Sequence, residues 1–398
     1  MVHTLSTSRV VSSFPASCVA VGLLLALAPG CGGDVTLVDS AKGSGGASSG
    51  ECAPRSADCN DDPTDGCEAD LGSDPANCGK CNVDCGGGAC SSGVCSEPPV
   101  VLANVSSPTL LKLNSTGVFF VASNATHTGS AIYRAAKDGS SVAPVTALLS
   151  YAEDLAVNDV SVFWTEMKEG VPDSGLAWSR LYSAPAKGGA PILLVDTGKA
   201  NLGKLVVDEA HVYWNEPFRI RRVPIGGGTA ETIIDGGAWD HEFVIDKTRV
   251  YWVPSDLNEL IIMSADKSGA GQGPLCMTSL RASHLTYDES WIYWGSPLDP
   301  KETTWRIERI STLGGVSSVV LSGVSVFSFI EFAVHQGFVY WTEFKQGRVL
   351  RAPVSGGSPE VLAAGLAEPT DITVDDSGIY WLTGVLSNMG AVMRLSLP

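Results

Sequence analysis

Positive charge is scarce in this chain. Its 398 residues include 26 Lys and Arg against 43 Asp and Glu, which gives a formal net charge of −17 at pH 7. That balance repels nucleic acids and anionic lipid, and no basic cluster offsets it locally. Familiar catalytic motifs are also missing, since the sequence holds no Gly-x-Ser-x-Gly, His-Glu-x-x-His or phosphate-loop motif. We therefore expect no nucleic-acid partner, and no known catalytic template can be assigned.

The N-terminal apolar run is also short. It covers residues 19–28, whereas a membrane-spanning helix needs about twenty apolar residues. With Arg9 before this run and small residues after it, the segment is typical of an export signal. We place this signal at residues 1–30.

The Ala-Pro-Gly-Cys sequence that ends at Cys31 resembles a bacterial lipobox. In a lipobox the cysteine is lipidated and becomes the first residue of the mature protein. The resemblance implies a lipid anchor on Cys31 and a Gly/Ser-rich tether over residues 31–50. Because Gly32 is not the Asp that signals inner-membrane retention, it also implies delivery to the outer membrane of a Gram-negative bacterium. An ordinary secretory signal that leaves Cys31 unmodified is the alternative.

Residues 51–98 combine many cysteines with few large apolar side chains. An exported segment of this composition holds together through disulfides, so we expect four bridges, whose connectivity is open among the 105 pairings that eight cysteines allow. Zinc is an alternative for the closely spaced Cys78, Cys81 and Cys85, but an oxidising compartment favours disulfides. The cysteines are Cys52, Cys59, Cys67, Cys78, Cys81, Cys85, Cys90 and Cys95.

Residues 58–68 of this segment are rich in carboxylates. Asp58, Asn60 and Asp62 match the first three ligand positions of an EF-hand loop, but Pro63 replaces its glycine and Ala69 its bidentate Glu. A Ca²⁺ site is thus an alternative to a rigid stalk with solvated acids, which we favour. The Asp-Gly-Cys-Glu and Asn-Cys-Gly-x-Cys sequences here resemble the Cys-rich spacers of exported bacterial lipoproteins.

A short β-rich phrase that ends in aromatic residues occurs seven times after residue 98. Successive final aromatics are 44, 50, 38, 42, 47 and 40 residues apart, the period of a four-stranded propeller blade. The sequence therefore predicts an all-β, seven-bladed β-propeller over residues 99–398. The final aromatics are Phe120, Trp164, Trp214, Trp252, Trp294, Trp341 and Trp381.

The chain ends before a fourth strand of the seventh repeat. Residues 99–105 are similar in sequence to residues 359–365, which lie at the fourth-strand position of the sixth repeat. We therefore expect residues 100–105 to pair as the outermost strand of the last blade and close the ring.

The phrases Tyr340-Trp341-Thr342-Glu343 and Phe163-Trp164-Thr165-Glu166 resemble YWTD-type propellers. Residues 99–398 as a whole are similar to YWTD-like and TolB-like repeat proteins. The resemblance implies the same blade chemistry, although YWTD propellers commonly have six blades and this sequence has seven repeats.

Two further positions recur. Six residues before most final aromatics lies a short acceptor such as Asp246, which we expect to bond turn amides. Third strands carry an arginine in five repeats, among them Arg222 and Arg351. We expect Glu216 and Glu343 to pair with these arginines across a hairpin.

Function is expected on one rim of the ring. The loops between second and third strands vary most in length, and variable loops on a rigid scaffold are where binding is usually built. Trp178, Trp239 and Trp305, with His241 and His284, lie in or beside this rim in the sequence, so we take them as candidate ligand-binding residues. We expect a protein, peptide or glycan ligand without catalysis, and no cofactor; a lyase or hydrolase with its site at the central mouth is the alternative.

Overall fold

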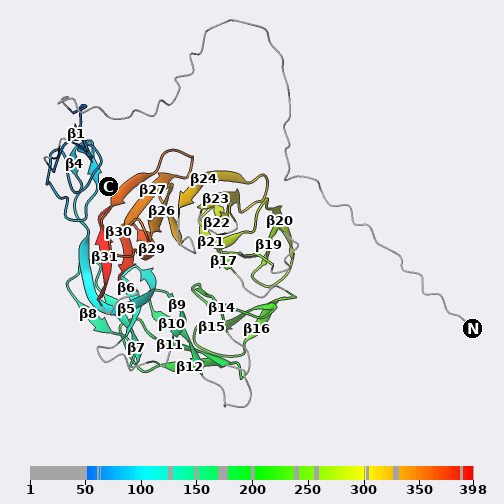
Figure 1. The fold of residues 1–398 in the computed structure, drawn as a ribbon. Helices are drawn as coiled ribbons and strands as arrows, with labels where there is room; N and C mark the ends of the chain where they lie inside the picture. The colour runs from blue at the N-terminus through cyan, green and yellow to red at the C-terminus, as the bar shows by residue number, and fades with distance from the viewer. Residues whose placement is uncertain are drawn as a thin grey trace, which may run out of the picture.

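The computed structural model describes residues 52–60, 62, 64–123, 129–147, 149, 152–168, 178–198, 202–236, 242–254, 260–299, 301, 304–325, 331–385 and 389–397. Over these residues every regular element is a strand, and no helix capable of crossing a membrane occurs. Seven antiparallel blades stand side by side in a ring, with β9, β17, β21 and β29 on its inner side and β8, β12, β16 and β20 at its periphery (Figure 1). The predicted propeller is confirmed.

Blades 1 to 6 each run from an inner strand to an outer one in chain order. The inner strands after blade 1 are β9 (Ala152–Val157), β13 (Leu205–Val207), β17 (Phe243–Ile245), β21 (Ser283–Asp288), β25 (Phe332–His335) and β29 (Thr370–Asp375). The second strands are β6 (Gly117–Ser123), β10 (Ser161–Lys168), β14 (His211–Glu216), β18 (Arg249–Trp252), β22 (Trp291–Pro297), β26 (Phe338–Glu343) and β30 (Gly378–Thr383).

The outer half of each blade follows the same order. Third strands are β7 (Ser130–Ala135), β11 (Trp178–Pro185), β15 (Arg219–Pro224), β19 (Ile261–Asp266), β23 (Thr304–Ser311), β27 (Arg348–Pro353) and β31 (Gly390–Leu395). Fourth strands are β8 (Val142–Pro144), β12 (Ile192–Asp196), β16 (Glu231–Asp235), β20 (Gly273–Met277), β24 (Ser318–Ser325) and β28 (Glu360–Ala363).

One long strand closes the ring. Strand β5 (Val100–Asn114) pairs through its first half with β31, where Asn104 lies opposite Ala391. Its second half pairs with β6 as the inner strand of blade 1, where Lys112 lies opposite Phe119. The first and last blades are therefore joined by a continuous backbone, as the sequence predicted for residues 100–105.

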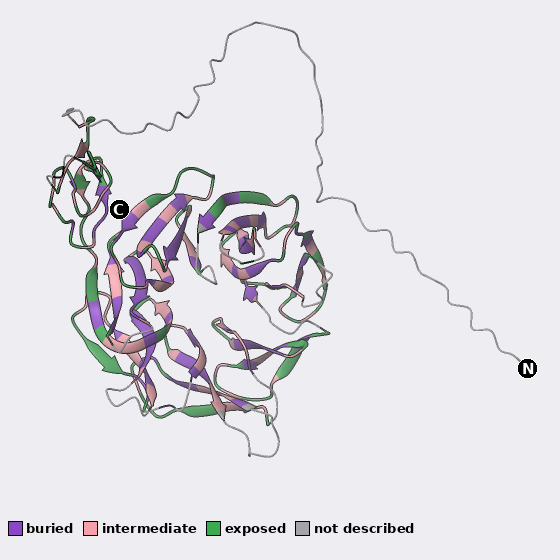
Figure 2. Ribbon diagram, in the orientation of Figure 1, coloured by how far each residue is buried: buried purple, intermediate pink, exposed green. Residues whose placement is uncertain are grey.

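The apolar core lies between the blades. Phe163 of β10 packs with Val212 and Trp214 of β14, and Tyr340 of β26 packs with Trp381 of β30. Buried residues accordingly line the middle of the sheets, while exposed ones follow the outer strands (Figure 2). Each fully buried side chain of this size contributes roughly 1.5–3 kcal/mol or more. The aromatic repeat is thus explained by packing between blades.

The recurring acceptors hold the turns between first and second strands, as predicted. Asp246 Oδ1 accepts the Thr248 and Arg249 amides, both at 2.6 Å, and its Oδ2 accepts the Tyr251 hydroxyl at 2.8 Å. Each of these carboxylates or amides therefore fastens a turn and, in blades 3, 4 and 5, also the first aromatic residue of the core pair. The equivalent turn acceptors include Asn114, Asn158, Asp208, Asp288 and Asp375.

The predicted pairing of strand-end glutamates with third-strand arginines is wrong in its partners. Glu216 pairs with Arg221 at 3.0 Å, whereas Arg222 pairs with Glu231 of the fourth strand at 2.9 Å. The cause is the alternation of side chains, because Arg221 lies opposite Trp214, on the face that also carries Glu216. Blade 6 repeats this arrangement with Glu343 and Arg348, and with Arg351 and Glu360.

The Cys-rich segment is a small module that contacts the propeller. It holds β1 (Ser56–Ala57), β2 (Ala69–Asp70), β3 (Cys90–Ser91) and β4 (Val94–Cys95). The Ala364 amide donates to the Gly87 carbonyl at 3.3 Å, and Gly88 forms a bridge with Ala363 of β28. The module thus lies against the edge of blade 6 (Figure 1). All eight cysteines are paired, as Cys52–Cys67, Cys59–Cys81, Cys78–Cys90 and Cys85–Cys95.

Candidate ligand site at the channel mouth

One position of the repeat carries an ionisable side chain in six of the seven blades, and its identity varies among Asp, Glu, Lys and His. It lies ten residues before the final aromatic, at the beginning of the inner strand. Blade 1 has Leu110 there and places Lys112 two residues further along β5. The beginnings of the inner strands lie on the rim that also carries the variable loops. We call the following seven residues the mouth ring: Lys112, Asp154, Lys204, Glu242, His284, Glu331 and Asp371.

The backbone is irregular at the mouth ring. Leu110, His284 and Asp371 have φ angles of 57°, 54° and 48°, a left-handed conformation that costs a non-glycine residue about 1–2 kcal/mol. The ladder register shifts at the same points of β5, β21 and β29. Bulges re-aim side chains, and they are common beside functional sites. Two residues of the mouth ring, His284 and Asp371, are therefore strained, as is Leu110, which occupies the same column in blade 1.

A cavity of about 600 Å³ extends from Lys112 along the inner strands of blades 1, 2, 3 and 7. Its wall is largely aliphatic, and Asn114 and Asp375 lie at its other end. This volume is within the range of small-molecule sites. The partly exposed aliphatic residues of this wall are Leu113, Val157, Val206, Val207 and Val374, whereas Leu155 and Leu205 are buried between the blades.

Three carboxylates of the mouth ring link neighbouring blades. Asp154 Oδ2 accepts the Leu205 amide at 2.6 Å, and Asp371 Oδ2 accepts the Leu111 amide, also at 2.6 Å. Glu242 accepts the Leu285 amide of the next blade in the same way. Each carboxylate thus accepts a backbone hydrogen bond with one oxygen lone pair, and its other lone pairs can accept from further donors.

Lys112 has an unusual environment for an ammonium group. Burial disfavours its charge, but the carboxylates of Asp154, Asp371, Glu331 and Glu242 outweigh that effect, and the pKa of Lys112 is raised. Even so, among the described residues no carboxylate lies close enough to form an ion pair with it. The half-buried Lys112 side chain therefore lies among acids from four other blades without forming an ion pair with any of them.

Glu331 and Asp371 are neighbours in the mouth ring. The Glu331 side chain is exposed to solvent, and its charge also depends on the protein groups around it. Burial and the nearby Asp371 raise the pKa of Glu331 to about 8, although Lys112 acts in the opposite direction. Burial also raises the pKa of Asp371. Glu331 is thus largely protonated at neutral pH and can donate a hydrogen bond.

Glu242 belongs to a second group with Lys204 and His284. Lys204 Nζ donates to Glu242 Oε2 at 2.7 Å and to the Leu285 carbonyl at 3.3 Å. Burial opposes ionisation of Glu242, but Lys204 and His284 outweigh it, and the pKa of Glu242 is lowered. On this side of the mouth, Lys204 and Glu242 form an ion pair, and the imidazole of His284 lies near it.

The predicted site residues divide into three groups. His284 does belong to the mouth ring, and its ring meets Trp305 edge-on at a centroid distance of 6.1 Å. Trp305 is only 2 % exposed and packs in the core with Trp341, so it offers no open aromatic face. Trp239 and His241 lie outside the described residues, and Trp178 begins β11 with its side chain outside the description.

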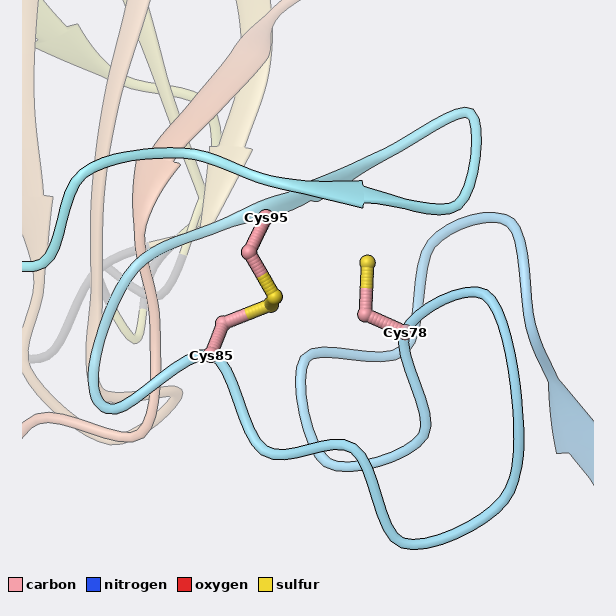
Figure 3. A group of neighbouring side chains, drawn as sticks. All are labelled: Cys78, Cys85 and Cys95. Atoms are coloured by element: carbon pink, nitrogen blue, oxygen red, sulfur yellow. A yellow bond between two sulfur atoms is a disulfide. The ribbon is translucent and has the colours of Figure 1, made fainter.

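The Cys-rich module supplies the one metal-like cluster found among the described residues. Cys78, Cys85 and Cys95 bring their sulfurs within 4.8 Å of one another (Figure 3). All three sulfurs are engaged in disulfides, to Cys90 and between Cys85 and Cys95, so the cluster is the meeting point of two bridges. Chemistry of this kind leaves no thiolate for zinc.

The acidic loop of the module uses its carboxylates on its own donors. Asp58 accepts the Asn60 amide at 3.3 Å, Asp65 accepts Asn60 Nδ2 at 3.0 Å, and Glu68 accepts the Cys59 amide at 2.7 Å. Calcium binding by this loop stays a prediction.

Six of the seven mouth-ring residues were missed as site residues in the sequence. The signal was present, because aligning the repeats on their final aromatics places an ionisable residue in the same column in six blades. It was hard to see because the column varies between acid, base and imidazole.

No family model and no curated protein matches the chain. Solved structures do. They include an oligogalacturonate lyase from Vibrio parahaemolyticus, with 12% identity, a TM-score of 0.52, and coverage of 75% of this chain and 92% of that one. YCF48 bound to D1 peptide has 9% identity, a TM-score of 0.50 and coverage of 75% and 96%. A nidogen/laminin complex has 16% identity, a TM-score of 0.45 and coverage of 64% and 93%. The fold is that of a β-propeller.

Proposed function

We propose that the protein is an exported lipoprotein of the cell envelope, anchored through Cys31 to the outer membrane, whose propeller binds a protein, peptide or glycan without altering it. The observation that carries the proposal is the environment of Lys112. The half-buried ammonium of Lys112, which has no ion pair among the described residues, lies at the entrance of a cavity among carboxylates from four other blades. Enclosed polar groups without direct partners favour the binding of a polar ligand.

The chemistry of Lys112 supports binding more than nucleophilic catalysis. Its pKa is raised because, against the effect of burial, the surrounding carboxylates favour the charged form. An ammonium that stays protonated is a hydrogen-bond donor and not a nucleophile. His284 joins it at the mouth, while Trp178, Trp239 and His241 stay candidate contacts of the same rim.

The propeller fold accommodates both kinds of activity. YCF48 is described as bound to a peptide, and the Vibrio protein as an oligogalacturonate lyase. At identities this low the likeness extends to the fold alone, so the residues at the mouth must decide between them.

A lyase or hydrolase is the second candidate, and one observation favours it. With a pKa of about 8, Glu331 holds a proton at neutral pH beside Asp371, as a general acid next to a base would. Glu331→Gln separates the two functions. If the protein binds and does not turn over, the variant keeps binding; an enzyme loses at least about a hundredfold in rate.

The anchor is tested in cells. Cys31→Ser removes the thiol that would carry lipid, so we expect the protein to leave the membrane fraction and to lose labelling by radioactive palmitate. Replacement of Ser40, in the same tether, by Ala is the matched control and should change neither property. Unaltered membrane retention of the Cys31→Ser protein would contradict a lipid anchor.

Binding is tested with the full chain carrying Cys31→Ser. The protein is immobilised and presented with purified envelope polysaccharide and with detergent-solubilised envelope proteins, and retention and product formation are both measured. We expect saturable retention of an unmodified component, weakened in Lys112→Met. Product formation from a retained polymer would instead support the enzyme.

A further inference from the structure

We propose that the mouth ring binds a neutral sugar residue of a glycan, with Lys112 donating to a sugar oxygen and the surrounding carboxyl groups accepting from sugar hydroxyls. This inference rests on the proposed binding function and specifies its ligand. It depends on the spacing of charges at the mouth, on the unused hydrogen-bonding capacity there, and on the wall of the cavity.

The spacing of charges comes first. Lys112 lies among Asp154, Asp371, Glu331 and Glu242, and each of them influences its charge. No ion pair joins Lys112 to any described carboxylate. A gap between an ammonium and carboxylates accepts a group that offers acceptors on one side and donors on the other. Adjacent hydroxyls of a sugar offer both, because each hydroxyl donates once and accepts through two lone pairs.

Unused hydrogen-bonding capacity is the second argument. Asp154 and Asp371 each hold a backbone amide of the next blade through Oδ2. A carboxylate has roughly four lone-pair sites, so acceptor capacity remains on both side chains. Glu331 adds a carboxyl group that is protonated near neutrality, which can donate or accept. The mouth thus presents both hydrogen-bond donors and acceptors to a ligand.

Charged ligands fit the mouth less well. A peptide carboxylate placed on Lys112 would also approach Asp154 and Asp371, and an ammonium placed on these acids would approach Lys112. Like charges brought together at an interface oppose binding. A neutral polyol makes the same hydrogen bonds without either repulsion. A metal ion is no better served, because no three ligand atoms of the ring converge among the described residues.

The cavity wall is the third argument. Below Lys112 the cavity lining includes the partly exposed aliphatic residues Val157, Val206 and Val374. A sugar has C–H faces as well as hydroxyl edges, so one residue can place its edge on the ring and its face on this wall. A cavity of about 600 Å³ is in the range that small-molecule sites occupy.

The test uses isothermal titration calorimetry on the full chain carrying Cys31→Ser. The probes are neutral trisaccharides of glucose, mannose, xylose and N-acetylglucosamine, and tripeptides with free termini. We expect at least one trisaccharide to bind, and Lys112→Met to weaken its binding at least about tenfold, since hydrogen bonds to charged groups contribute about 1.4 kcal/mol or more. Asp154→Asn keeps an oxygen that can accept the Leu205 amide, so it should fold normally, and we expect it to weaken binding by about fivefold. It therefore tests the site independently if Lys112→Met misfolds.

Lys267→Met is the matched control. Lys267 pairs with Asp208 at 2.7 Å beside a turn between first and second strands, away from the mouth, so trisaccharide affinity should stay within about twofold of the parent value. A second readout is ionic strength. Affinity for a neutral saccharide should change little between low and high salt, whereas a ligand held by its charges weakens markedly as screening increases.

Each outcome decides something. Trisaccharide binding that is salt-insensitive and lost in Lys112→Met supports the inference. Binding that Lys112→Met leaves intact overturns it, as does an entirely inactive trisaccharide panel. If a tripeptide or an envelope protein binds instead and depends on Lys112, the sugar assignment fails while the proposed binding function stands. If neither the probes nor any envelope component is retained, both fail.

Discussion

The two ends of the inner strands hold the propeller together by different means. At the turn end, blades 1 to 5 and blade 7 place Asn or Asp in the same position, where it accepts hydrogen bonds from the amides of its own turn. At the mouth end, the equivalent column changes from acid to base to imidazole, and Lys112 has no ion pair among the described residues. A repeated residue that satisfies itself serves the fold. A position that stays ionisable while its residue type changes from blade to blade favours a role in contacting a ligand.

The two ends also respond to pH in opposite directions. Near the turns, burial opposes ionisation of Asp208, but hydrogen bonds from Lys267 and from the Ala210 and His211 amides lower its pKa to about 2. At the mouth, burial and Asp371 raise the pKa of Glu331 to about 8. Acid therefore loosens the turn end, and alkali charges the mouth end.

The largest expected effect is at the turn end. Asp246→Ala removes the acceptor of two turn amides and of the Tyr251 hydroxyl, so we expect unfolding free energy to fall by about 2–3 kcal/mol. Urea unfolding at pH 7 measures it. Asp235→Ala is the control, because Asp235 forms only an exposed pair with Arg219 and should cost about 0.5 kcal/mol or less. Equal losses in the two variants would contradict a fastening role for the turn acceptors.

A smaller effect is expected from Lys267→Met. Asp208 contributes stability that is fully present above its unfolded pKa near 4 and is lost as pH falls toward 2. Without Lys267 the pKa of Asp208 should rise, so the acid-unfolding midpoint should move to higher pH and neutral stability should drop by about 1 kcal/mol. The exposed Lys187→Met serves as the comparison variant. An unchanged acid midpoint would show that the turn amides alone hold the Asp208 carboxylate.

Much of the fold could be predicted because every blade buries aromatic side chains against its neighbour in the same way. The final aromatics recur because each fills the space between two sheets, and the similarity of residues 99–105 to 359–365 identified the closing strand before any pairing was known. The partners of Glu216 were not predictable in the same way. They depend on which face of the sheet each arginine occupies, and that follows from the hairpin register.

The site was less predictable for two physical reasons. Trp305 was placed at the rim because it follows a long loop segment, but β22 and β23 continue beyond the repeat core, and Trp305 lies opposite Pro297 within the sheet. The mouth ring takes one side chain from each of the seven blades, and only closure of the ring brings these side chains together. In blade 1 the column holds Leu110, and the ionisable residue is Lys112, two positions further along β5 and opposite Phe119, so aligning the repeats does not reveal it.

The smallest expected effect is at the mouth end. A carboxyl group whose folded pKa lies above its unfolded value binds more protons when folded, so Glu331 lowers stability progressively as pH rises from about 4.5 to about 8. The slope should stay well below the one-proton limit of about 1.4 kcal/mol per pH unit, because channel water screens the charge. Glu331→Gln removes this dependence, so its melting temperature should approach or exceed that of the parent above pH 8 and differ little near pH 5. Thermal melts from pH 5 to 9, with the exposed Glu289→Gln as control, measure the difference. If the melting temperatures of Glu331→Gln and the parent change with pH in parallel, Glu331 is already ionised at neutral pH. The mouth carboxyl group would then resemble the carboxylates of the turn end, whose pKa values are lowered.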